Sequence, residues 1–371
     1  MRLLGARRSL LSLAAHLDRD RWRPIVCGQS HGDLEDALAE HDIPFEVVKL
    51  GWWRKGRYFL WRPFVISRLA ALIARVGADI VHCNEIYPNP YAIRACAQAA
   101  RTMGREPPVI THMRLTITPR MIRNYDLVRA AKIVVPSEEA GNDFNVWADK
   151  DERVQVIHNG VDLSEFHRER PQEIARRSVG LPEAGFLFGS IGQLGPRKGG
   201  DVILRAFEKV APDFPGASLF FIGNPHRGQE DFARELRSAS TRPALAGRVK
   251  FFSFTRDVLP FYESLDTNLL VSRSEGFGRT IIEAAALGAP TIGARVGGIP
   301  ELIEHGRTGL LVEPENETEL AETMAKIMSD VQAMKTMGEM AFRKTAQQFS
   351  IQSHTATVMD LYDSLCAKSR A

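Results

Sequence analysis

The feature that most constrains the fold of this 371-residue chain is the alternation of short apolar runs with amphipathic segments. A run that is apolar on both faces is typical of a strand buried between two helical layers. We therefore predict an α/β protein with parallel sheets covered by helices. The expected strands cover residues 24–27, 79–83, 109–112, 132–135, 154–157, 186–191, 218–222, 249–252, 268–271, 290–292 and 310–312.

These strands fall into two groups, separated near residues 163–182 by a charged stretch without periodicity. A chain of this length is expected to form two domains. We predict two Rossmann-like, doubly wound domains, over residues 1–165 and 170–348. In such folds a ligand binds outside the carboxyl ends of the strands, and we expect it in a cleft between the domains.

The beginning of the chain departs from this pattern, because only residues 1–4 precede the first helical segment. A doubly wound domain usually begins with a strand, and the loss of a central strand would leave its two neighbours with unpaired edges. We therefore expect the first strand of the N-terminal domain to be missing from this sequence. We expect that it lies upstream or that this half is incomplete.

Composition excludes several classes of protein. Lys and Arg number 48 and Asp and Glu 45, a net charge of +3 that is too balanced to predict a nucleic-acid partner. The four cysteines have no spacing typical of a zinc site or a disulfide framework. The longest apolar stretch, residues 64–76, contains two arginines and is too short to span a bilayer. Without a signal-peptide pattern, the sequence predicts a cytoplasmic protein.

Residues 272–288 form the most informative segment. The strand expected at 268–271 leads into a loop with Gly276 and Gly278, and a helix is expected to begin near Thr280. Glycines at such a junction let backbone N–H groups approach a ligand, and the N-terminus of a helix favours an anion. The segment therefore predicts a phosphate-binding loop.

Two carboxylates belong to the same segment. Glu275 lies in the loop, and Glu283 follows eight residues later in the first helical turn. A carboxylate beside a phosphate site can accept hydrogen bonds from sugar hydroxyls. Glu283 has an alternative explanation, because Thr280 and Glu283 also have the spacing of a capping box.

A second glycine-rich loop, residues 192–201, follows the strand expected at 186–191. It carries Arg197 and Lys198, two cations that can neutralise a diphosphate, and we expect Lys198 to be exposed to solvent. The alternative is a solvated turn with Asp201 as the N-cap of the next helix.

With these loops the chain resembles the retaining glycosyltransferases of family 4 (glycosyl transferases group 1). Glu275 and Glu283 match the E-x7-E motif of that family, and Lys198 with Gly199 matches its phosphate loop. The further matches are residues 297–301, residues 306–312 and the Asn-Gly-Val-Asp element at residues 159–162. The resemblance implies the GT-B fold, with residues 349–371 forming a helix that crosses back to the first domain.

The resemblance also implies an activity. It implies transfer of a sugar from a nucleotide-diphosphate sugar to a glycan, a lipid-linked acceptor or another hydroxyl. The anomeric configuration would be retained, with no metal and no cofactor. Catalytic roles would fall to His112, Glu275 and Lys198, and Gly5 would border the acceptor. The donor would be bound by Arg197, Lys198, Gly276, Phe277, Gly278, Arg279, Thr280 and Glu283.

One position departs from the family pattern, which usually has Arg where this chain has Gln193. Arg197, on the same loop, is the cation that we expect to replace it.

Three alternatives stay open: a non-catalytic subunit that binds a nucleotide sugar, a nucleotide-sugar epimerase, and a synthase of the sucrose-phosphate type. Asp149 and Asp151 have the Asp-x-Asp spacing of metal-dependent transferases, but we expect a solvated turn there.

Residues 52–64 concentrate six aromatic and four basic residues. Aromatic rings beside basic residues suit a membrane interface with anionic headgroups. We therefore expect peripheral contact with the inner face of a membrane, as a lipid-linked acceptor would require. The alternative is that the tryptophans pack on the core.

Overall fold

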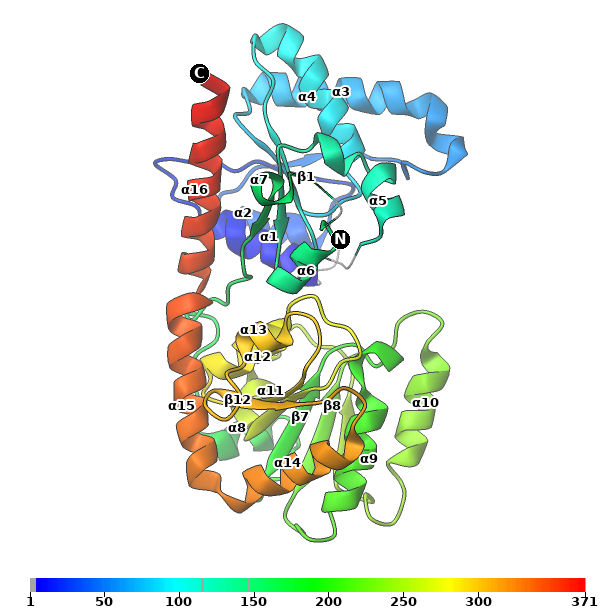
Figure 1. Cartoon of the computed structure of the whole chain (residues 1–371), viewed down its shortest axis with the longest axis vertical. Helices are drawn as coiled ribbons and strands as arrows, with labels where there is room; N and C mark the ends of the chain where they lie inside the picture. Colours follow the sequence, from blue (N-terminus) through cyan, green and yellow to red (C-terminus); the bar gives the residue numbers. More distant parts are fainter. Residues whose placement is uncertain (1–4, 115–116, 146, 148, 371) are drawn as a thin grey trace. The chain divides into compact units, whose positions relative to one another are not determined.

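The computed structural model describes residues 5–114, 117–145, 147 and 149–370, which form two compact units (Figure 1). Unit 1 contains the chain up to Gly160 and again from Ile351, and unit 2 contains Val161–Ser350. The units divide near the domain boundaries expected at residues 165 and 349. The last helix, α16 (Ile351–Arg370), belongs to unit 1.

Unit 2 contains a six-stranded sheet in the order β12-β11-β10-β7-β8-β9. Every pairing in it is parallel, as the continuous apolar runs predicted. The strand positions expected from the sequence are confirmed to within two residues. The strands are β7 (Leu187–Ile191), β8 (Ser218–Ile222), β9 (Val249–Phe252), β10 (Thr267–Leu270), β11 (Thr291–Ala294) and β12 (Gly309–Val312).

Both faces of this sheet are buried. Successive side chains of a strand point to opposite faces, so Phe220 and Phe221 of β8 enter two different hydrophobic clusters. Side chains of α9 and α14 join the cluster of Phe221, and those of α11 and α12 join that of Phe220. The helical elements are α8 (Gln172–Ser178), the 3-10 helix η3 (Pro196–Lys198), α9 (Gly200–Val210), α10 (Glu230–Ala239), α11 (Leu259–Ser264), α12 (Arg279–Ala286), α13 (Ile299–Leu302), α14 (Glu317–Ser329) and α15 (Val331–Gln348).

Unit 1 contains two separate parallel sheets among its described residues. One has four strands in the order β3-β4-β5-β6, and the other has two. The sequence missed β2, because its three residues include the polar Glu46 and none is fully buried. The strands are β1 (Val26–Gly28), β2 (Phe45–Val47), β3 (Val81–Cys83), β4 (Val109–His112), β5 (Lys132–Val135) and β6 (Val154–Val156).

Helices cover the four-stranded sheet of unit 1. Leu13 of α1 and Leu361 of α16 lie in one buried cluster with Ile110 of β4, so that the first and last helices share a core. Residues 1–4, on which the expectation of a missing first strand depends, lie outside the described residues. The helical elements are α1 (Gly5–His16), α2 (Asp33–Ala39), η1 (Gly56–Trp61), α3 (Arg62–Val76), α4 (Asn89–Met103), α5 (Pro119–Asn124), η2 (Leu127–Arg129), α6 (Glu138–Asn142), α7 (Lys150–Arg153) and α16.

In the part of the chain that the structure describes, every helix is too short or too polar to cross a bilayer.

Candidate functional site

The two glycine-rich loops of unit 2 lie against each other. Strands β7 and β10 are parallel neighbours, so the loops that follow them leave the same edge of the sheet. The backbone N–H of Arg273 donates to the carbonyl of Arg197 at 2.8 Å. Gly199 has φ 67°, and a Cβ there would lie 2.2 Å from the carbonyl oxygen of Val271. Glycine is therefore required at this position for the close approach of the loops.

An ion pair joins the two loops. The Lys198 ammonium lies 2.6 Å from Oε2 of Glu275, and Nη1 of Arg197 lies 3.4 Å from the same oxygen. The side chains of Lys198 and Glu275 are only 17% and 13% exposed. The expectation that Lys198 is exposed to solvent is therefore wrong, because the neighbouring loop covers it.

The protonation state of Glu275 follows from this contact. Burial raises its pKa, but the charges of Lys198 and Arg197 and the hydrogen bonds from Lys198 and Ser272 together lower it by more. The net result is a pKa below the ordinary value, so the carboxylate is ionised at neutral pH. Glu275 is thus suited to accept hydrogen bonds and unsuited to donate a proton.

A third loop, which follows β11, supports the backbone of Glu275. The N–H of Gly298 donates to the carbonyl of Glu275 at 3.2 Å. Gly297 has φ 53°, and a Cβ on it would lie 1.7 Å from the same oxygen. This close approach explains the glycine at position 297, since a larger residue there would push the Glu275 loop away.

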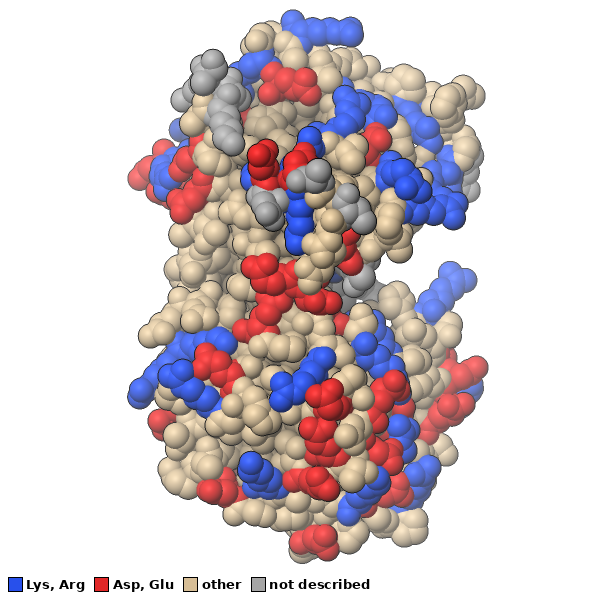
Figure 2. Space-filling model, in the orientation of Figure 1, with Lys and Arg blue, Asp and Glu red and all other residues tan. Residues whose placement is uncertain are grey.

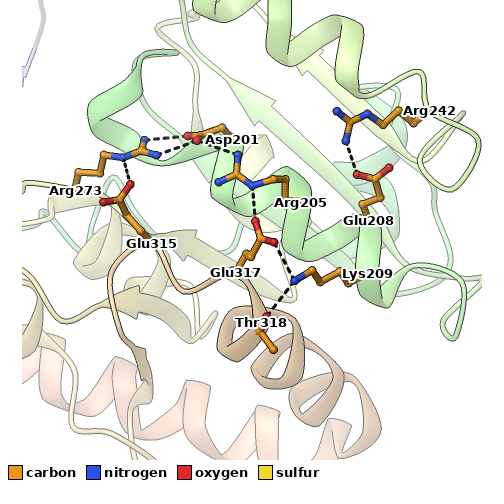
Figure 3. Close-up of polar contacts among 9 residues, drawn as sticks. All are labelled: Asp201, Arg205, Glu208, Lys209, Arg242, Arg273, Glu315, Glu317 and Thr318. Carbon is orange, nitrogen blue, oxygen red and sulfur yellow. Dashed lines mark hydrogen bonds and ion pairs between the residues drawn. The ribbon is translucent and has the colours of Figure 1, made fainter.

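Arg273 ties the loops to the helices around them (Figure 3). Its guanidinium donates to both carboxylate oxygens of Asp201 at 2.9 Å and to Glu315 at 2.8 Å, and it also donates to the carbonyl of Pro196. The N-cap of α9 is Gly199, so the alternative in which Asp201 caps that helix is wrong. The sequence analysis missed Arg273, because no spacing links it to a partner 72 residues away.

Glu283 is held by two neighbours in the core of unit 2. Its Oε2 accepts a hydrogen bond from the Tyr262 hydroxyl at 2.6 Å, and its Oε1 lies 3.1 Å from Nη2 of Arg279. Helix α12 begins at Arg279 with Gly278 as its N-cap, so the capping-box alternative built on Thr280 is wrong. No sequence signal pointed to Tyr262, which lies on the separate helix α11.

The other residues expected to bind a donor lie around the start of α12. Gly276 and Gly278 belong to the loop before this helix, and Thr280 is its second residue. The side chain of Phe277 is buried, with its ring 6.2 Å from that of Phe349. The side chain of Phe277 is therefore part of the core of unit 2.

A small pocket lies at the carboxyl end of β7. Gln193 and Lys198 line it together with Ser190, Gly192, Gly195 and Gly200. Arg197, which we expected to replace the missing cation at Gln193, lies instead beside Glu275 and donates to the carbonyl of Ser274 at 2.8 Å. The pocket itself therefore has a single basic side chain in its lining.

His112 is the last residue of β4 in unit 1 and is fully buried. Its ring stacks on that of His82 at 5.6 Å, and neither of its ring nitrogens has a hydrogen-bond partner among the described residues. Burial lowers its pKa well below the ordinary value, and the nearby charge of Arg114 lowers it further. His112 is therefore neutral at neutral pH.

Polar side chains join the ends of three strands in unit 1, and the sequence analysis gave two of them, Asn84 and Arg114, no role. Arg114, two residues after β4, donates to Oδ1 of Asn84 at 2.7 Å and to Oδ1 of Asn159 at 2.8 Å. Asn84 follows β3 and also donates to the carbonyl of Ala6, next to Gly5 at the start of α1. Polar residues placed directly after strands were the signal that could have revealed this group.

The Asp-x-Asp pair lies at the start of the short helix α7, where we expected a solvated turn. Asp149 is the N-cap of α7 and forms an ion pair with Arg153. The side chain of Asp151 lies outside the described residues.

Comparison with known proteins places both units in recognised families. Residues 4–165 match Glycosyltransferase Family 4, and residues 171–344 match Glycosyl transferases group 1. The N-acetyl-alpha-D-glucosaminyl L-malate synthase of Bacillus anthracis is 27% identical over 83% of this chain and 80% of its own length. The lipopolysaccharide core biosynthesis mannosyltransferase LpcC of Rhizobium leguminosarum bv. viciae is 28% identical over 89% of this chain and 87% of its own length.

Solved structures show the same fold. HepE from Anabaena, crystallised with UDP and glucose, superimposes with a TM-score of 0.82 at 24% identity, over 97% of this chain and 96% of HepE. A glycosyltransferase from Rickettsia africae gives a TM-score of 0.83 at 23% identity, over 97% of this chain and 94% of that protein. The chain therefore belongs to the family 4, group 1 glycosyltransferases and has the GT-B fold.

Proposed function

We propose that the protein transfers a sugar from a nucleotide-diphosphate sugar to a hydroxyl group of a glycan or glycolipid, with retention of the anomeric configuration. The observation that carries this proposal is the contact between Lys198 and Glu275, which brings a cation and a carboxylate together between two glycine-rich loops. A diphosphate needs the first group, and a sugar with several hydroxyls needs the second.

In the proposed reaction the bond between the anomeric carbon and the diphosphate breaks, and the electron pair leaves with the phosphate oxygen. The acceptor hydroxyl attacks the same face, and its proton passes to the departing phosphate. Negative charge develops on the leaving group, where Lys198 and Arg197 would stabilise it without a divalent ion. Lys198 must then exchange its contact with Glu275 for one with phosphate.

Glu275, ionised because its pKa is lowered, would be freed to accept hydrogen bonds from the hydroxyls of the donor sugar. Glu283, which Tyr262 and Arg279 hold in place, would accept the ribose hydroxyls of the nucleotide. His112 would lie beside the sugar from unit 1, and Gly5 would border the acceptor.

The names of the relatives support the substrate class. One relative is described as a mannosyltransferase of lipopolysaccharide core biosynthesis, and HepE is described in complex with UDP-glucose. For this chain we therefore propose a nucleoside-diphosphate hexose as donor and a saccharide or a lipid-linked saccharide as acceptor.

The test is a transfer assay with UDP-, GDP- and ADP-hexoses and a panel of sugar and lipid-linked acceptors, with the products analysed by proton NMR. We expect a product with the anomeric configuration of the donor, formed equally well with and without EDTA. Isomerised donor without transfer would support the epimerase alternative. Donor binding without turnover would support a non-catalytic subunit, and either result would contradict the proposal.

A further inference from the structure

The most exposed apolar side chains among the described residues gather in one segment of unit 1. Leu60 is 86% exposed, and the other large apolar side chains of the described residues that are more than half exposed come from the same segment. Elsewhere in the described chain no large apolar side chain is more than 48% exposed. We call the following five residues the aromatic patch: Trp52, Phe59, Leu60, Trp61 and Phe64.

An ordered frame presents the aromatic patch. The ring of Trp53 lies edge-on to the buried Tyr91 at 5.1 Å, and the guanidinium groups of Arg62 and Arg94 lie 4.3 and 4.6 Å from it. Trp53 thus fixes the segment to the rest of unit 1, as the packing alternative expected. The same alternative fails for Trp52 and Trp61, which are more than half exposed.

The surroundings of the aromatic patch are strongly basic. Residues 49–78 contain seven basic residues and no Asp or Glu. In Figure 2, Lys and Arg side chains gather on the side of unit 1 where Figure 1 places α3 and α4. A surface that is both apolar and positively charged complements an anionic surface with an apolar interior. Two copies of this chain packed through the patch would instead bring like charges together.

We propose that the aromatic patch is a docking surface for an anionic lipid bilayer. Trp52 and Trp61 would lie at the level of the headgroups, where indole rings are favoured, and Phe59, Leu60 and Phe64 would reach the acyl chains. The basic residues around them would bind lipid phosphates, with an attraction that salt screens.

The test is flotation with vesicles of phosphatidylcholine, either pure or with one third phosphatidylglycerol. We expect the wild-type chain to float with the anionic vesicles and to be released by high salt. In the variant Leu60→Ser/Trp61→Ser/Phe64→Ser the fraction of protein bound to vesicles should be at least tenfold lower than in the wild type. The same decrease is expected for Arg54→Glu/Lys55→Glu. The matched control Phe254→Ser/Phe342→Ser removes two exposed apolar side chains of unit 2 and should bind like the wild type.

Three outcomes would overturn the proposal. They are equal flotation of the triple variant and the wild type, no binding of the wild type to anionic vesicles, and a dimer in sedimentation that the triple variant abolishes. The changed side chains are exposed, so circular dichroism should report the native fold in every variant. Nucleotide affinity measured in parallel should not change, which separates a failure of this proposal from a failure of the proposed glycosyl transfer.

Discussion

The ammonium of Lys198 is the group on which the proposed chemistry most depends, and it lies in a partly buried ion pair. Each charge of the pair compensates the other: Glu275 neutralises Lys198 in the absence of ligand, and a diphosphate would take over that role. Removal of one partner from such a pair leaves the other charge buried and uncompensated. The contribution of Lys198 to folding must therefore be separated from its contribution to catalysis.

Comparison of a single variant with a double variant makes that separation. We expect Lys198→Ala to lower the free energy of unfolding by about 2 kcal/mol, because Glu275 then keeps the more distant Arg197 as its charged partner. The double variant Lys198→Ala/Glu275→Gln should recover most of that loss. In both variants the turnover rate should be at least 100-fold lower than in the wild type, since the charge that stabilises the leaving group is absent. Recovery of turnover together with stability would assign Lys198 a purely structural role.

Glu283 offers a second test at the same scale. If its carboxylate accepts ribose hydroxyls, Glu283→Ala should weaken nucleotide binding by about 1–3 kcal/mol. Tyr262→Phe removes one hydrogen bond to Glu283 but keeps the carboxylate, and it should cost about 1 kcal/mol or less. Calorimetric titration measures both affinities, and equal affinities for wild type and Glu283→Ala would refute the ribose role.

At the scale of secondary-structure elements, Arg273 connects the loop after β10 to α9 and to the loop after β12 (Figure 3). A planar guanidinium that binds one carboxylate with two parallel bonds fixes orientation as well as distance. Arg273 is thus a positioning residue, which holds the backbone of Arg197 and Lys198 beside Glu275.

Arg273→Lys should therefore lower kcat by about tenfold or more while KM for the donor changes little, because a lysine keeps the charge but loses the fork. Arg242→Ala is the control: Arg242 pairs with Glu208 on the same surface but contacts neither glycine-rich loop. Steady-state kinetics of both variants give the comparison. An unchanged kcat in Arg273→Lys, or a loss of the same size in Arg242→Ala, would contradict the positioning role.

The elements of unit 2 also show which features could be predicted from the sequence. The strands of unit 2 and its two glycine-rich loops were predictable, because buried parallel strands are apolar throughout and the loops follow them directly. The partners of the loop residues were not predictable. Asp201 and Arg273 are 72 residues apart, and Tyr262 reaches Glu283 from another helix. A single sequence holds no signal for pairings that only the fold brings together.

At the scale of the whole molecule, we expect unit 1 to lose stability in mild acid because of two buried histidines. Unit 1 buries His112 and encloses Nε2 of His82, whose Nδ1 lies 2.6 Å from the Tyr362 hydroxyl of α16. Burial, together with the nearby charges of Arg114 and His354, lowers the pKa of His82 to about 3. Both histidines thus bind protons more weakly in the folded state than in the unfolded state.

The sign of the effect follows from that difference. Below the unfolded pKa of about 6.5 the unfolded chain binds protons that the folded chain does not. The free energy of unfolding therefore decreases as the pH is lowered. We expect unit 1 to lose about 1.4 kcal/mol per pH unit for each histidine between pH 6.5 and 4.5. Urea titrations at several pH values test this, with His226→Gln, an exposed position in unit 2, as control. A stability of unit 1 that does not change across this range would contradict the expected protonation states.

The central claim is that the two glycine-rich loops of unit 2 bind the diphosphate of a nucleotide sugar. Calorimetric titration of the wild type and of Lys198→Ala/Glu275→Gln with UDP, GDP and ADP tests it most directly. The account predicts that the wild type binds one of these nucleotides at a single site, that the double variant binds it at least tenfold more weakly, and that Arg242→Ala binds it like the wild type. Unchanged affinity in the double variant would contradict the account.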